Sequence, residues 1–378
     1  MIRLSKSSIS KSEKQGVLSV LDKEYLGMGE EVASFENKLT NFIGRPAVCV
    51  SSGTSALHLA LQAVGISNPD EVLVPSLTYV ASFQAISATG ATPVPCDINE
   101  NDLTLNIDDC RKRVTKNTKA IMPVFYSGGT GDLNELYNFA KDFNLRVIED
   151  AAHAFGTKIG SKLVGSFGDI SCFSFDGIKN ITSGEGGAIV TDDQKVLSLV
   201  KDSRLLGVIK DSNKRNFNER SWDFEVKYQG WRYHMSNLMA AIGIEQLKRF
   251  KKMAKRRQEI AFLYKDKFED CSFIKTLELN YKFIVPHIFP IIIPKLNRRD
   301  ALRKDLLKDG IETGIHWKPN HYLEKFSCMK AHNNPLEVTE RIFPKILTLP
   351  LHADLKDKEV DFVCKKLIYK LERNEFTY

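Results

Sequence analysis

Short apolar runs alternate with stretches of helical period from about residue 45 to residue 195. The apolar runs predict strands at 47–50, 71–76, 92–98, 119–125, 145–151, 170–175 and 187–192. Apolar residues recur at helical spacing in the stretches 55–65, 79–90 and 133–144. Strand, helix and strand in this order are typical of a largely parallel sheet covered by helices on both faces. The pattern therefore predicts an α/β domain.

The pattern changes beyond residue 235. A long helix is predicted at 236–268, with a small, apolar first half and a charged second half. A strand-like run follows at 283–294, and helical periods follow at 298–310 and 357–372. A chain of 378 residues is long for one compact core. We therefore expect two units, a large domain over 1–245 and a smaller C-terminal α+β domain over 246–378.

Composition narrows the class of protein. Hydrophobic residues make up 43% of the chain and charged residues 27%, the balance of a soluble globular protein. The apolar run 283–293 is too short for a membrane span, and the polar N-terminus lacks the apolar core of a signal peptide. The seven cysteines are therefore expected to be free thiols in the cytoplasm. The sequence contains no CxxC pair, so no structural zinc site is expected. We expect no membrane partner.

The net charge of +7 comes partly from a basic cluster at 247–257. A nucleic-acid groove would interleave aromatic residues with the basic ones, and this cluster offers only Phe250. The cluster is therefore interpreted as the solvated face of a helix, and no nucleic-acid partner is expected.

Residues 51–61, SSGTSALHLAL, join the first strand to a helix. The unpaired N–H groups at a helix start, with the positive end of the helix dipole, form an anion site. Serine and threonine at this position also serve as ordinary N-caps. Phosphate binding and simple capping both remain open for this stretch.

Residues 147–156, VIEDAAHAFG, place Glu149 and Asp150 at the end of an apolar strand. Open α/β sheets bind ligands just beyond such strand ends. An acid there can hold a cationic ring nitrogen or a metal, or it can cap the next helix. His153 follows three residues later and suits packing as well as function.

Lys179 lies between the predicted strand 170–175 and a loop with three glycines. An ordinary solvated lysine is one interpretation of it. A phosphate cradle, a buried aspartate and a lysine at a strand end together match the needs of pyridoxal 5'-phosphate (PLP), which binds a lysine amine, a carboxylate and a phosphate site. Tyr79, after another strand end, offers an aromatic face for the ring.

The chain resembles the DegT/DnrJ/EryC1/StrS family of PLP-dependent nucleotide-sugar aminotransferases. The resemblance rests on segments in one order along nearly the whole chain: YLGMGEEVASFENKL, SSGTSALHLAL, DEVLVPSLTYVAS, GATPVPCDI, TKAIMPVFYSGGTGDL, IEDAAHAFGT, GSFGDISCFSFDGIKNITSGEGGAIVT, GWRYHMSNLMAAIGIEQL and LPLHADLKDKEV. It implies the aspartate aminotransferase type I fold, with a mainly parallel seven-stranded sheet in the large domain. It also implies a homodimer with shared active sites.

The resemblance assigns roles by position. Lys179 would be the catalytic Schiff-base lysine, and Asp150 would be the partner of the pyridine nitrogen. The phosphate would be held by Gly53, Thr54, Ser55 and Ser174, and by Asn237 reaching in from the neighbouring subunit. Tyr79 would stack on the ring, and His153 would lie near the phenolic oxygen. His316, Trp317 and Lys318, in the segment 314–326, would contact the sugar nucleotide, although Trp317 equally suits packing in the small domain.

The chain departs from the family pattern at Asp176 and Gly177, where many relatives have His-Pro, at Phe125, where a histidine is frequent, and at His153, where glutamine is frequent. The resemblance implies transfer of an amino group from glutamate to a nucleotide-linked keto sugar. A 4-keto-6-deoxyhexose is expected, for a surface polysaccharide such as the O-antigen of lipopolysaccharide. A 3-keto sugar, a cyclitol, and a dehydratase or lyase reaction on the same fold remain alternatives. Relatives that dehydrate have histidine at the lysine position, so Lys179 favours amino transfer.

Overall fold

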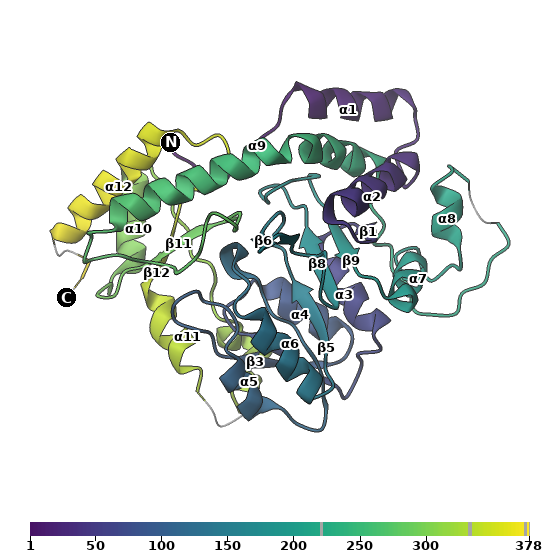
Figure 1. Cartoon of the computed structure of the whole chain (residues 1–378), viewed down its shortest axis with the longest axis horizontal. Helices are drawn as coiled ribbons and strands as arrows, with labels where there is room; N and C mark the ends of the chain where they lie inside the picture. The colour runs from purple at the N-terminus through teal and green to yellow at the C-terminus, as the bar shows by residue number, and fades with distance from the viewer. Residues whose placement is uncertain (220–221, 332–334, 374–375, 378) are drawn as a thin grey trace.

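The computed structural model describes residues 1–219, 222–331, 335–373 and 376–377 (Figure 1). Its main feature is a seven-stranded sheet in the order β1-β9-β8-β5-β4-β2-β3. The strands are β1 (Ala47–Val50), β2 (Glu71–Pro75), β3 (Thr92–Cys96), β4 (Thr118–Ile121), β5 (Arg146–Asp150), β8 (Ile170–Ser174) and β9 (Gly187–Val190). β9 is antiparallel to both of its neighbours, β1 and β8, and the other pairs of adjacent strands are parallel. The seven apolar runs thus form one sheet, which confirms the predicted fold class.

Helices cover both faces of the sheet. The helices of this part are α1 (Lys11–Asp22), α2 (Glu30–Ile43), α3 (Gly53–Ala63), α4 (Val80–Ala88), α5 (Ile107–Arg113), α6 (Leu133–Asp142), α7 (Gln194–Ser203) and α8 (Asp211–Arg215). In β2, Val72 and Val74 pack in one core with side chains of α3 and α4, whereas Leu73 packs in another with α5 and α6. Alternation of side chains along a strand explains why each apolar run serves two cores.

Helix α9 (Asn237–Phe268) joins this layer to the C-terminal unit, as Figure 1 shows. Its N-cap Ser236 accepts a hydrogen bond from Met239 N. The first half packs on the core of the sheet domain, and the second half packs in the C-terminal core through residues such as Tyr264 and Phe268. The expected boundary at 245/246 falls inside this helix, so the division into two domains stays a prediction.

The C-terminal unit combines a three-stranded antiparallel sheet with helices. Its elements are β10 (Lys275–Thr276), β11 (Phe289–Ile292), β12 (Ile346–Leu349), α10 (Arg299–Lys308), α11 (Glu337–Ile342) and α12 (Asp357–Glu372). Short elements elsewhere are β6 (Lys158–Ile159), β7 (Lys162–Leu163) and the 3-10 helices Tyr126–Gly128, Asn320–Tyr322, Glu324–Ala331 and Phe343–Lys345.

The strand expected over 283–294 is shorter, and only β11 forms within it. The backbone before it bonds to the sheet domain instead, because Lys158 N donates to Phe283 O and Val285 N donates to Thr157 Oγ1. Pro286 has no N–H to offer a strand partner. The segment therefore crosses between the two units and carries His287 to the site described below.

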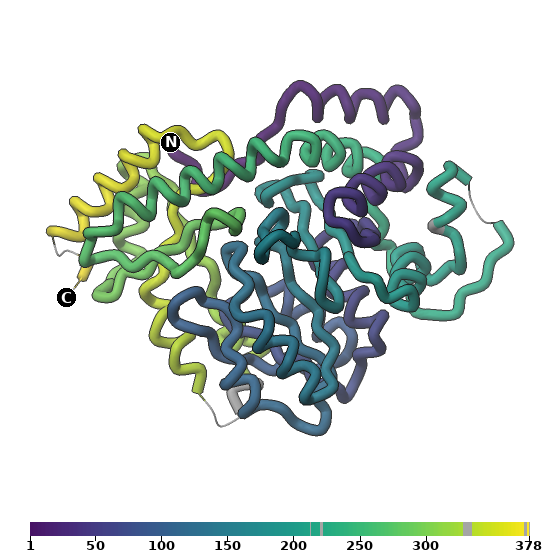
Figure 2. Tube along the Cα trace, viewed as in Figure 1, coloured from purple at the N-terminus to yellow at the C-terminus, as the bar shows by residue number. Residues whose placement is uncertain are grey.

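The N-terminal residues also cross between the units. Ile2 N donates to Gly310 O, and Leu351 N donates to Leu4 O. Figure 2 shows the start of the chain lying with the C-terminal unit, beside the beginning of α12. The first residues thus belong spatially with the C-terminal sheet, although α1 and α2 pack against α9 near the large sheet.

Candidate active site

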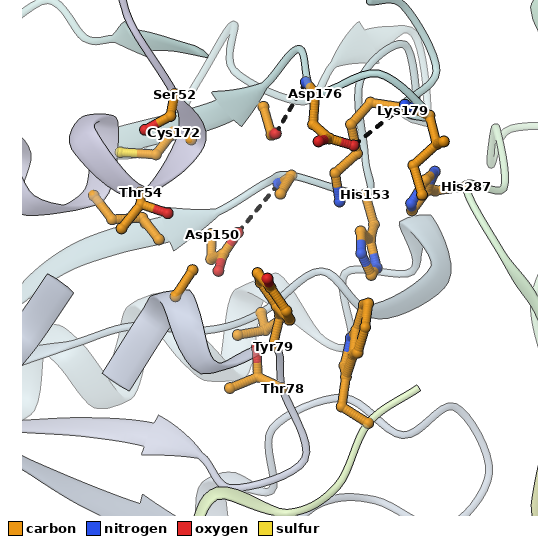
Figure 3. Close-up of a pocket in the computed structure, with 18 of the residues that line it drawn as sticks. Ser52, Thr54, Thr78, Tyr79, Asp150, His153, Cys172, Asp176, Lys179 and His287 are labelled. Carbon is orange, nitrogen blue, oxygen red and sulfur yellow. Dashed lines mark hydrogen bonds between the residues drawn. The ribbon is translucent and has the colours of Figure 1, made fainter. Parts of the chain in front are cut away.

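A cavity of about 420 Å³ lies where the parallel strands of the large sheet end (Figure 3). It receives side chains that follow β1, β2 and β4, and others from the ends of β5 and β8. It is lined by Ser52, Gly53, Thr54, Leu57, Thr78, Tyr79, Ala81, Val124, Asp150, Ala152, His153, Cys172, Ser174, Asp176, Ile178, Lys179, Glu185, His287 and Trp317. The carboxyl ends of strands are the usual ligand position in such sheets.

The start of α3 forms one end of the cavity. Ser52 caps the helix by accepting a hydrogen bond from Ser55 N. A Cβ built on Gly53 would lie 2.8 Å from Ser174 Cβ and 3.1 Å from its Oγ, so only glycine lets the helix start approach β8 this closely. The free N–H groups of the first turn and the Ser174 hydroxyl therefore lie together as an anion cradle. Gly53, Thr54 and Ser174 line this cradle.

Ser55 lies behind the cradle. It is buried, and its hydroxyl donates to Ser52 O while accepting from Ser52 N. This side chain completes a capping box and does not line the cavity. Its predicted contact with phosphate stays a prediction, and the structure shows it supporting Ser52.

Asp150 ends β5 and faces the cavity. Its carboxylate accepts hydrogen bonds from Ser82 Oγ at 2.8 Å and from Ala152 N at 3.2 Å. Burial raises the pKa of Asp150, while these two bonds and the nearby Lys179 act to lower it. The carboxylate is thus held in place inside the protein, where a cationic ring nitrogen would stabilise its charge. The sequence did not indicate Ser82, because α4 meets β5 only through the tertiary fold.

Lys179 follows β8 in a tight turn, and its N–H donates to Asp176 O at 3.1 Å. The returning loop contains Gly184 at φ +82°, a left-handed conformation that favours glycine. In Figure 3 the lysine side chain extends toward the space between Asp150 and His153. Burial lowers the pKa of Lys179 to about 8, helped by the Arg257 cation and opposed by Asp150 and Asp176. A substantial fraction of the amine is therefore neutral near that pH, as a nucleophile requires.

Aromatic rings bound the open side of the cavity. The rings of Tyr79 and Trp317 lie with their centroids 4.8 Å apart, and Tyr79 is 54% exposed. The segment that carries Trp317 is held against the loop after β2, since Asn320 Nδ2 donates to Thr78 O. His316 Nδ1 bonds to Thr348 Oγ1 at 2.9 Å instead of facing the cavity, and Lys318 is exposed outside it. Of the three expected substrate contacts, only Trp317 lines the cavity of the single chain.

Two histidines lie beside Lys179 with their ring centroids 4.5 Å apart (Figure 3). His153 was expected from the sequence, whereas His287 arrives from the crossing segment 283–288. The Nδ1 atoms of both rings are buried and have no hydrogen-bond partner among the described residues. Burial and the Lys179 cation lower the pKa of both imidazoles. Both rings are therefore neutral around pH 7.

Asn237 lies outside this cavity, at the start of α9. Its Nδ2 donates to Tyr25 O at 2.9 Å, and its Oδ1 accepts from Val32 N. The side chain is buried and helps to fix α2 against α9. Its predicted role at the phosphate of a partner subunit stays a prediction.

The arrangement fits PLP. The cradle that a Cβ at Gly53 would fill suits a phosphate, and the buried Asp150 carboxylate suits a protonated pyridine nitrogen. Lys179 provides a partly neutral amine between them, and Tyr79 provides an aromatic face. Together these groups define the site of a PLP-dependent enzyme.

Comparison with known proteins gives the same class. The model of the DegT/DnrJ/EryC1/StrS aminotransferase family matches residues 7–368. GDP-perosamine synthase of Escherichia coli O157:H7 is 35% identical over 363 residues, which cover 95% of this chain and 96% of that protein. The spore coat polysaccharide biosynthesis protein SpsC of Bacillus subtilis is 36% identical over 371 residues, covering 94% and 93%. The PLP-form structure of Spr1654 from Streptococcus pneumoniae superposes with a TM-score of 0.90 at 27% identity, covering 98% and 99%.

The chain therefore belongs to the DegT/DnrJ/EryC1/StrS aminotransferase family. Its fold is that of the type I PLP-dependent aminotransferases, and its cofactor is PLP. The resemblance inferred from the sequence is thus confirmed, as is the enzyme class.

Proposed function

We propose that this enzyme transfers an amino group from glutamate to the keto group of a nucleotide-linked sugar, a 4-keto-6-deoxyhexose. The observation that carries the proposal is the Lys179 amine, which lies in the cavity between Asp150 and the histidine pair at the end of the sheet. The sugar is supported by the style of the FSFDGIKNITSGEGG segment and by relatives named for perosamine and spore coat polysaccharide. A product destined for a surface polysaccharide follows the same analogy.

Each residue of the site has its own role in the proposed reaction. PLP, when bound, supplies an electron sink for the substrate carbon. The N–H groups at the start of α3 and the Ser174 hydroxyl bind the phosphate, and Asp150 keeps the ring nitrogen protonated. Lys179 Nζ accepts a proton from the donor carbon and later returns one to the sugar carbon, which requires its neutral form. His153 and Trp317 line the space next to Nζ.

Lys179 also favours amino transfer over a dehydratase reaction, because relatives that dehydrate have histidine at that position. The structure brings the Lys179 side chain into the cavity, where an amine can move protons. Amino transfer to a 3-keto sugar remains the second candidate, because the cavity accommodates the same groups in either case.

A homodimer with shared sites is part of the proposal. Among the residues that line the described cavity, Lys179 is the sole lysine or arginine, beside the acids Asp150, Asp176 and Glu185. A sugar nucleotide carries at least two negative charges that need further cations. The segment between α8 and α9, here called the arm, exposes Phe217 and Trp222, by 80% and 86%. Exposed aromatic groups of this kind mark protein interfaces. A second subunit would bury them and supply the missing charge.

The cytoplasm is the proposed location, because the six cysteines whose side chains the structure describes are free thiols. Within the described residues, no helix is long and apolar enough to cross a membrane.

The test is a panel of keto-sugar nucleotides with glutamate as donor, following release of 2-oxoglutarate. The wild-type enzyme should turn over a 4-keto-6-deoxy substrate, and K179A should lose both turnover and the visible absorbance band of the lysine-bound cofactor. Turnover by K179A would contradict the role of Lys179. Turnover restricted to 3-keto sugars would replace the proposed substrate with the second candidate.

A further inference from the structure

A buried arginine on α9 lies directly behind the lysine loop. Arg257 is 3% exposed, and its guanidinium donates to four backbone carbonyls. Nη1 donates to Pro286 O at 3.4 Å, His287 O at 3.1 Å and Leu351 O at 3.4 Å, and Nη2 donates to Ile178 O at 3.5 Å. The guanidinium thus joins the residue before Lys179, the residue that lines the cavity beside it, and the C-terminal unit.

Arg257 has no acidic partner in the described part of the chain, and its Nε has no hydrogen-bond acceptor there. Other buried arginines differ, since Arg204 pairs with Glu36 and Arg113 pairs with Asp109. Removing one partner from a buried ion pair is strongly unfavourable, so a buried cation without an acid is costly to fold. Burial lowers the pKa of Arg257 to about 10, which still leaves it charged at neutral pH. The Arg257 cation is therefore buried at a cost to the free energy of folding.

The Arg257 guanidinium lies next to the Lys179 loop. A narrow cavity behind the lysine loop is lined by Gly177, Lys179, Asn180 and Arg257 together. The titratable groups whose charge is coupled to that of Lys179 are the acids Asp150 and Asp176, the imidazoles His153, His287 and His316, and the Arg257 cation. The imidazoles are neutral at pH 7 because their pKa values are lowered by burial. Arg257 is therefore the one permanent cation of this set.

We propose that Arg257 is a positioning residue for Lys179, which fixes the Ile178 carbonyl and whose charge disfavours the protonated form of the Lys179 amine. Two like charges disfavour each other, and this effect is strong where water is excluded. A lysine that must act as nucleophile and base needs its proton removed first. The inference deepens the proposed aminotransferase function and rests on it for its purpose, but its physical content concerns the cofactor-free chain.

The test measures the protonation of Lys179 directly. Cofactor-free protein is treated with a reductive methylation reagent over a range of pH, and methylation of Lys179 is quantified by peptide mass spectrometry. In R257Q, which retains donors but not the charge, the half-point of the curve should move to higher pH by about one unit. Methylation at pH 7.5 should fall several-fold as a result.

Two variants serve as controls. R257K restores a cation and should give a curve close to that of the wild type. R256Q changes the adjacent arginine, which bonds to Leu355 O and Asp357 outside the site, and should leave the curve unchanged. A wild-type curve for R257Q, or an equal shift in R257K and R257Q, would overturn the proposal, because a purely structural role would not distinguish the two variants.

Circular dichroism and thermal melting establish that each variant is folded. If R257Q does not fold, R257H takes its place, since a buried imidazole is neutral at pH 7.5 and still donates a hydrogen bond. It should shift the curve in the same direction, and an unshifted curve counts against the proposal. Failure of the proposed function is read separately, from wild-type enzyme that releases no 2-oxoglutarate with any keto sugar.

Discussion

Gly53 and Ser174 lie so close that a single methyl group between them would collide with the serine side chain at 2.8 Å. The contact brings the first turn of α3 against the end of β8, and it creates the anion cradle. The substitution G53A should therefore push the helix away from the strand and weaken cofactor binding by tenfold or more, with a loss of about 1–3 kcal/mol in stability.

Absorbance titration of the cofactor-free variant with PLP measures the binding. The variant S174A leaves the space open and removes one hydroxyl donor, so it should weaken binding less than G53A. Wild-type affinity in G53A would show that the phosphate binds elsewhere.

Ser82 donates a hydrogen bond to Asp150 and lowers the pKa of that carboxyl, against the effect of burial. In S82A the pKa of Asp150 should rise further, because the ionised form loses a donor. The acid limb of the pH–rate profile should move to higher pH, and activity near pH 6 should fall about tenfold, the worth of one hydrogen bond to a charged group.

The control for S82A is S87A, which changes another α4 serine that is not a donor to Asp150. An unchanged acid limb in S82A would mean that Asp150 is not the group that titrates there.

The lowered pKa of Lys179 predicts a pH-dependent stability. Its pKa is about 8 when folded and 10.5 ordinarily, so the unfolded chain binds more protons between these values and stability rises with pH. Lys179 therefore destabilises the cofactor-free protein most fully below about pH 8. K179M should stabilise it at pH 7 by up to about 3 kcal/mol, and the difference should shrink as pH rises toward 10.5.

Urea unfolding of the cofactor-free protein at several pH values measures this difference. A control variant, K318M, changes an exposed lysine outside the cavity and should show no such trend. Equal stability of K179M and wild type at every pH would contradict the lowered pKa of Lys179.

Trp317 lines the cavity, whereas its neighbour Lys318 does not. W317A should raise KM for the keto sugar about two- to tenfold, the range of one aromatic contact, and W317F should restore most of it. K318A should leave KM near the wild-type value. A larger effect of K318A than of W317A would place the substrate on the exposed side of this segment.

The exposed aromatic residues of the arm between α8 and α9 predict that the protein forms a dimer. Replacing Phe217, Trp222 and Phe224 with serine should shift a dimer toward monomer in sedimentation velocity runs and should lower activity with it, because burial of such rings stabilises an interface. The serine variant of Phe362, an exposed ring on α12, is the matched control and should stay dimeric. A dimer that survives the triple substitution would place the interface elsewhere.

The local pattern of apolar and polar residues predicted much of the fold of this enzyme. Buried parallel strands produce continuous apolar runs, so the strands that carry Asp150 and Ser174 were readable in the sequence. Ser82, His287 and Arg257 were not readable as site residues, because each comes to Lys179 or Asp150 from an element distant in sequence. The run 283–294 shows the limit well, since it is apolar enough for a strand but its first residues bond to Thr157 and Lys158 instead.

The pairing of Ile2 with Gly310 and of Leu4 with Leu351 has a consequence for folding order. During synthesis, residues 2–4 wait without a partner until more than three hundred further residues have left the ribosome. The same stretch continues into Ser7, whose hydroxyl donates to Gly177 O beside the lysine loop. Residues 2–4 can therefore join the C-terminal unit only late in synthesis, and a chain stalled before residue 310 would leave them without these partners.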